Sequence, residues 1–103
     1  MVVVAHGIMI TTAQRIPRRT VREYLGLVSG EALGHLRAPD LGPVSFGLGE
    51  AGVGENALRR ALQAMAQRAS DLGATVIIGV SIDYTAVGPG ALLVNVTGTA
   101  ARL

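Results

Sequence analysis

The side chains best suited to binding or acid–base chemistry are carboxylates and tyrosines at strand-like positions. We take Glu23, Tyr24, Glu31, Asp83 and Tyr84 as candidate ligand-binding residues. Neighbouring carboxylates can share a proton or hold a ligand, and two tyrosines can frame a pocket, although aromatic residues on strands more often belong to a core. The simpler alternative is that Glu23 or Asp83 forms an ion pair with Arg22 or with an arginine of a neighbouring subunit. No Ser-His-acid arrangement is present, so we predict no catalytic residue.

Metal binding has weak support in the residue types. The two histidines, His6 and His35, are too far apart in sequence to form a ligand pair on one helix face. The chain has no cysteine, so a soft metal would need imidazole, thioether or carboxylate ligands. We predict no cofactor. A divalent metal held between subunits remains as an alternative.

Two further patterns point to anions. Gly47 to Gly52 matches the dinucleotide-binding spacing, but a poor strand precedes it and too little chain follows for further βαβ units. Arg15, Arg18, Arg19 and Arg22 cluster, which indicates a solvated loop more than a phosphate-binding patch. With a net charge of +2 and no aromatic residue among these arginines, nucleic acid is not an expected partner.

Length and composition indicate a single domain, residues 1–103, that associates with itself. Half of the residues are hydrophobic, 3% are aromatic and 16% are charged. This is a high apolar share for a small monomer, and it favours a second buried surface between copies. The opening segment lacks the features of a signal peptide, and no apolar run is long enough to span a membrane. We expect a cytoplasmic protein.

The clearest predicted element is a helix over Glu55 to Leu72. Apolar residues recur every three or four positions and form one stripe. Gly73 suits the left-handed residue that closes a helix. The stripe consists of Ala57, Leu58, Ala61, Leu62, Met65, Ala66, Ala69 and Leu72.

Strands are predicted on both sides of this helix. Short ones cover Val2 to Ala5 and Ile8 to Thr12, and a longer one covers Thr20 to Ser29, with Val21, Leu25 and Leu27 on one face. The segments Thr75 to Thr85 and Ala91 to Ala100 alternate and form a hairpin across a Gly-Pro turn. Residues 38–54 are rich in Pro and Gly, and we expect a mobile loop there.

This order predicts an α+β fold, an antiparallel sheet with one helix packed on a face. In the last two strands we expect the even-numbered residues to face the helix. They are Val76, Ile78, Val80, Ile82 and Tyr84, then Leu92, Val94, Val96, Gly98 and Ala100. The opposite face is left for another copy of the chain.

Several motifs resemble the YbjQ-like family of small bacterial proteins. They are Thr11-Thr12, the segment from Glu23 to Ala32, Leu72-Gly73-Ala74, the segment from Gly79 to Tyr84, and Val96 to Ala100. Together they cover nearly the whole chain in the family's order. The Pro- and Gly-rich stretch from His35 to Gly54 departs from the charged, aromatic helical segment that is usual there.

The resemblance implies a dodecin-like α+β subunit in a ring-shaped homo-oligomer, usually a pentamer. The family is also described as heavy-metal-binding, a description that names no established activity. We therefore expect a non-enzymatic, ring-forming protein that binds a small ligand or serves as an assembly module. The alternatives are a metal-binding protein with sites between subunits and a small enzyme with an intersubunit site.

Overall fold

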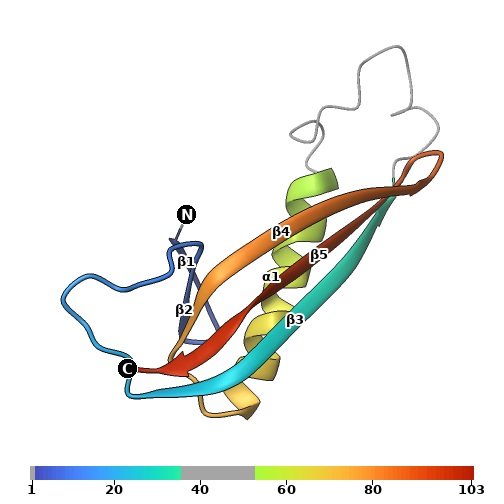
Figure 1. Ribbon diagram of the computed structural model, residues 1–103. Helices are drawn as coiled ribbons and strands as arrows, with labels where there is room; N and C mark the ends of the chain where they lie inside the picture. The colour runs from blue at the N-terminus through green and yellow to red at the C-terminus, as the bar shows by residue number, and fades with distance from the viewer. Residues whose placement is uncertain (1, 36–52) are drawn as a thin grey trace.

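A computed structural model of the chain describes residues 2–35 and 53–103, which form a five-stranded sheet with one helix on a face (Figure 1). The strands follow the order β1-β2-β4-β5-β3, and every pair is antiparallel except β2 with β4. The elements are β1 (Val2–Ala5), β2 (Ile8–Thr11), β3 (Glu23–His35), α1 (Val53–Asp71), β4 (Val76–Gly88) and β5 (Ala91–Arg102). The predicted α+β class is confirmed.

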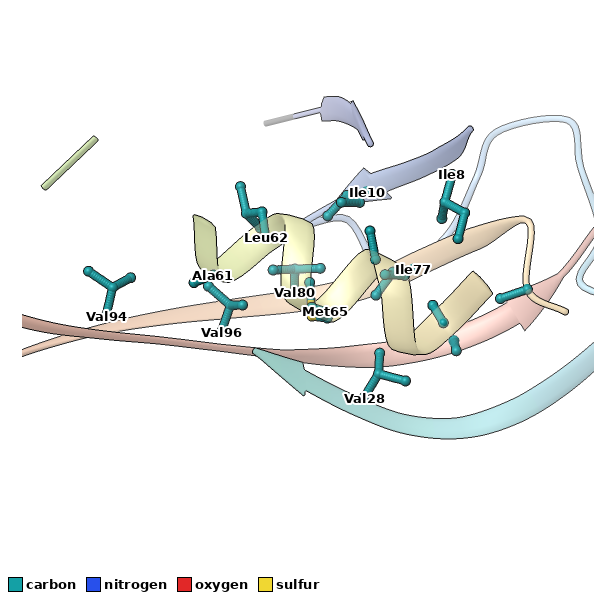
Figure 2. Close-up of a cluster of buried hydrophobic side chains, with 14 of the residues drawn as sticks. Ile8, Ile10, Val28, Ala61, Leu62, Met65, Ile77, Val80, Val94 and Val96 are labelled. Atoms are coloured by element: carbon teal, nitrogen blue, oxygen red, sulfur yellow. The ribbon is translucent and has the colours of Figure 1, made fainter. Parts of the chain in front are cut away.

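The helix α1 covers β3 and β5 with the predicted apolar stripe (Figure 2). Ala61, Met65 and Ala69 are fully buried, whereas Leu58 is half-buried. The helix begins at Val53, and the rest of the loop expected over residues 38–54 lies outside the described residues. None of the described helices is long and apolar enough to cross a membrane.

The end of α1 corrects one member of the stripe. The backbone N–H of Gly73 donates to the carbonyl of Ser70 and that of Ala74 donates to the carbonyl of Ala69, at 2.9 and 3.0 Å. With Gly73 at φ 83°, this pairing is a Schellman motif and stops the helix at Asp71. Leu72 therefore lies beyond the helix and is exposed, not buried as predicted.

In β5 the predicted faces are confirmed. Leu92, Val94, Val96 and Ala100 belong to the core beneath α1, and Asn95 and Thr97 are exposed on the opposite face, which we call the back face. The hairpin with β4 is also confirmed, because the two strands pair antiparallel up to Gly88 and Ala91.

In β4 the predicted single face is wrong. The register with β5 shifts between Ile78 and Ser81, where Gly79 has φ 61° and its N–H donates to the carbonyl of Ala13 at 2.9 Å. This bulge inserts one residue and reverses the alternation. Val80 and Ile82 face α1 as predicted, but Val76 and Ile78 lie on the back face.

The strand β3 also differs from its prediction. It starts at Glu23 and runs to His35, well past the expected end at Ser29. A register shift at Leu25 places that side chain on the α1 side and Leu27 on the back face, so the two do not share a face as predicted. Gly30 keeps the strand beneath the helix, because a β-carbon there would lie 2.7 Å from the backbone nitrogen of Met65.

The back face has a small core of its own at one end. Val76, Ile78 and Ala101 are buried there beneath Ile16 and Val21, which come from the connection between β2 and β3. The arginines of that connection, at positions 15, 18, 19 and 22, are all exposed. Two apolar anchors therefore hold this arginine-rich segment against the sheet.

Candidate functional site

The predicted site residues do not converge on one place. Tyr24 pairs with Ala101 at the start of β3 and lies on the back face, whereas Tyr84 pairs with Val94 and lies on the face of α1. Seven residues separate those two partners along β5, which is about 23 Å of strand. The two tyrosines therefore do not frame one pocket within a subunit.

Glu23 does form an ion pair within the subunit, but its partner is Arg102 and not the predicted Arg22 or an arginine of a neighbouring subunit. Its Oε1 lies 3.3 Å from Nη1 of Arg102, which belongs to the paired position on β5. Both side chains are largely exposed, so this pair contributes well under about 1 kcal/mol to stability. The guanidinium also donates from Nε to the carbonyl of Gly73 at 3.2 Å, which ties the strand end to the end of α1.

The sheet does bring Glu31 and Asp83 together. Glu31 pairs with Asn95, and Asn95 pairs with Asp83, so the three side chains form a row across β3, β5 and β4 on the back face. All three are exposed. Both carboxylates were predicted from their residue type at strand-like positions, but Asn95 was missed because only the strand register shows that it lies between them.

The histidines lie at opposite ends of the sheet. His6 and Gly7 form the two-residue turn between β1 and β2, both with positive φ, 52° and 74°, as a type I′ hairpin requires. His35 ends β3 beside Ala91, at the far tip of the long strands (Figure 1). In residues 2–35 and 53–103, no three His, Cys, Asp or Glu side chains are grouped as a metal site would need.

Exposed apolar side chains mark the two outer strands. In the described part of the sheet, β1 and β3 are the edges and neither has a partner on its outer side. Val2 and Val4 of β1 are 63% and 72% exposed, and Tyr24 and Leu27 of β3 are 68% and 85% exposed. All four lie on the back face, because their paired residues do. A long open edge that carries apolar groups is a site for pairing with another strand.

Beside β1 the surface is hollowed. An open groove of about 400 Å³ runs between β1 and α1. Its lining is largely apolar, and Arg59 and Gln63 add polar groups. It is lined by Val3, Val4, Ala5, Leu58, Arg59, Leu62 and Gln63.

On the other edge, two arginines of α1 reach the backbone of β3. Nη2 of Arg60 donates to the carbonyl of Leu33 at 2.7 Å, and Nη1 of Arg68 donates to the carbonyl of Ser29 at 2.6 Å. Four residues of strand and eight residues of helix both cover about 12–14 Å, so the two spacings match. The sequence places these arginines on the polar side of an amphipathic helix. Their hydrogen bonds to the backbone of β3 were not predicted.

Comparison with known proteins gives a consistent set of relatives. Residues 52–103 match a YbjQ family model described as "Putative heavy-metal-binding". A UPF0145 protein from Carboxydothermus hydrogenoformans is 39% identical over 99 residues, covering 89% of this chain and 92% of that protein. A UPF0145 protein from Corynebacterium jeikeium is 35% identical over 100 residues, covering 89% and 95%.

A solved structure gives the same fold. It is the crystal structure of a DUF74-family protein of unknown function from Pediococcus pentosaceus. It aligns with a TM-score of 0.75 and 21% identity, over 95% of this chain and 99% of that one. At this identity the likeness concerns the fold alone.

Proposed function

We propose that this chain, which belongs to the YbjQ-like family of small bacterial proteins, is a non-enzymatic subunit that assembles with copies of itself into a closed ring. The expected ring is a pentamer, as the resemblance in sequence implies. The assembled protein would serve as a binding or assembly module. The names of its relatives state no enzymatic activity.

The observation that carries this proposal is the pair of open, apolar sheet edges. Soluble monomers usually protect an edge strand with charge, proline or a covering element. Here Leu27, 85% exposed, and Val4, 72% exposed, extend into solvent from the two edges of the described sheet. Burying a Val or Leu side chain fully is worth about 1.5–3 kcal/mol before ordering costs. Association would recover part of that free energy at both edges.

The shape of the subunit supports the same proposal. The molecule extends 50 × 24 × 19 Å and has a radius of gyration of 15.3 Å. A compact domain of about 100 residues has a radius near 13 Å. The long strands β3, β4 and β5 thus form an extended ribbon, which a neighbouring subunit could cover.

The difference between the two edges supports a repeating head-to-tail arrangement. An interface that joins two different surfaces repeats from copy to copy, and it ends either in a ring or in an open fibre. A closed ring leaves no free edge, which suits a stable, dispersed protein.

Native mass spectrometry of the full chain tests this proposal. We expect one dominant closed oligomer whose mass does not change over a tenfold dilution, and size exclusion with light scattering should agree. A single species at the mass of one chain, 10.6 kDa, would refute the proposal. A continuous ladder of masses would refute the closed ring while keeping self-association.

A metal site between subunits is the second candidate, favoured by the row of Glu31, Asn95 and Asp83. Its donors are oxygens, which suit hard cations such as Ca²⁺ or Mn²⁺ and not the soft metals that thiolates select. This row within one subunit therefore does not fit a soft heavy metal. A second copy would have to complete the shell.

Isothermal titration of the assembled protein with calcium, manganese, zinc and copper tests this candidate. Binding in the row predicts that the double variant E31Q/D83N loses the heat of binding while keeping its oligomer mass. The variant Asn95→Ala should weaken the same signal. No heat with any of the four ions at micromolar protein would remove the candidate.

A further inference from the structure

The two open edges of the sheet carry matching apolar pairs. Val2 and Val4 extend from β1 on the back face, and Tyr24 and Leu27 extend from β3 on the same face. If β1 of one copy continued the sheet of the next at β3, these four side chains would meet on one continuous surface. Pairing β1 with β1, or β3 with β3, would instead leave one kind of edge unused.

The arginines of α1 leave only the first half of β3 open to an added strand. Arg60 and Arg68 already donate to the carbonyls of Leu33 and Ser29, so the second half of this edge is partly occupied. No described side chain donates to the backbone of Leu27, and the stretch 23–28 stays open. This open stretch is slightly longer than β1, which has 4 residues.

The groove beside β1 suits an added strand. In strand addition, backbone hydrogen bonds form along the edge while alternate side chains enter neighbouring pockets. The groove lies on the α1 side of β1, with Val3 and Ala5 against Leu58 and Leu62. On the incoming β3, the half-buried Leu25 on the α1 side would pack there, and Leu27 on the other face would meet Val4.

The charges of the two edges are complementary. Arg59 lies at the groove beside β1, and residues 2–22 contain no Asp or Glu. On β3, Glu23 lies on the α1 side, because its partner on β5 is Arg102. In a continued sheet Arg59 and the Glu23 of the incoming strand would lie on the same side. Arg102, on β5 of the incoming copy, can share this carboxylate with Arg59, because the ion pair between Arg102 and Glu23 is exposed to solvent.

We infer that β1 of one copy pairs with residues 23–28 of β3 in the next copy, head to tail around the ring. This inference rests on the proposed self-assembly and adds which surfaces meet. Arg60 and Arg68 set the register, because they occupy the other half of the receiving edge. The interface is asymmetric, and each subunit uses both of its edges.

Cysteine cross-linking tests the interface, since the natural chain has no cysteine. The variants Val4→Cys and Leu27→Cys replace exposed side chains and should fold normally. A short bismaleimide, which tolerates a register error of about two residues, would be added to the V4C/L27C double variant. We expect covalent dimers and higher multiples up to the full ring, and V4C mixed with L27C should give dimers only.

The matched control is V4C/L33C. Leu33 lies on the same face of the same strand, six residues or about 20 Å further along, in the half that the arginines occupy. We expect little cross-linking there. Efficient cross-linking of V4C alone or of L27C alone would show a symmetric interface and overturn the inference.

Native mass spectrometry of the same samples separates the two proposals. A ring without V4C/L27C cross-links overturns the interface and leaves self-assembly standing. A monomer without cross-links overturns both. Cross-linking of V4C/L33C in place of V4C/L27C would show that the arginines do not set the register.

Discussion

Replacing Gly30 by alanine should loosen the contact between α1 and β3. A β-carbon at this position would clash with the carbonyl oxygen of Ala61 and would lie 2.7 Å from the backbone nitrogen of Met65. Both obstacles are main-chain atoms of the helix, so no side-chain rotation relieves them. The helix has to move away from the strand, and the packing of Met65, which is fully buried, suffers with it.

The magnitude follows from two opposing effects. Overpacking a close contact costs about 1–3 kcal/mol, and a backbone obstacle places this site at the upper end. Alanine in place of glycine within a strand returns about 0.5–1 kcal/mol. We therefore expect G30A to lower the free energy of unfolding by ~2 kcal/mol.

Urea denaturation followed by circular dichroism at 222 nm measures this change. Protein concentration must be held constant, because association shifts apparent stability. The control is Ser29→Ala, next along the strand on the exposed back face, where a change within about 0.5 kcal/mol is expected. A G30A protein as stable as the natural one would refute the close approach of helix and strand.

Three other substitutions, two of them paired with a control variant, test separate parts of the structure. Val94→Glu should abolish folding, because it places a charge in the core beneath α1, whereas Thr97→Glu on the exposed back face should fold, as circular dichroism and solubility would show. Arg68→Gln should lower the free energy of unfolding by about 0.5–1.5 kcal/mol through loss of its bond to β3, with the exposed Arg15→Gln as a near-neutral control. Gly79→Val should cost about 1–3 kcal/mol in urea denaturation because φ is 61° there, and an unchanged midpoint would contradict the bulge.

The sequence was sufficient to predict which side chains are buried wherever the hydrophobic periodicity is uninterrupted. The spacing of three and four gave the buried side of α1, and the alternation of β5 gave its two faces. It failed at the two bulges, because one inserted residue at Gly79 or Leu25 reverses every face beyond it. The predicted strand end at Ser29 was also wrong, because Gly30 lets β3 continue beneath a close helix.

The candidate site was harder to predict for a related reason. Glu31 and Asp83 were identified by type, but their relation through Asn95 depends on the register of three strands. The arginines that donate hydrogen bonds to β3 are on the solvated side of α1. Their spacing shows that they share one helical face, but it does not show what they contact. Contacts between distant segments depend on tertiary packing, which local patterns do not encode.

The parallel pairing of β2 with β4 has a consequence for the order in which the molecule opens. Only two residue pairs are in register there, Met9 with Val76 and Ile10 with Ile77. The paired residues are 67 positions apart in the sequence, so closing the loop between them costs entropy and slows the pairing. The first hairpin should therefore join the fold last and detach first, with its amide protons exchanging faster than those of β5. If a neighbour holds β1, dilution below the assembly threshold would selectively speed exchange in that hairpin.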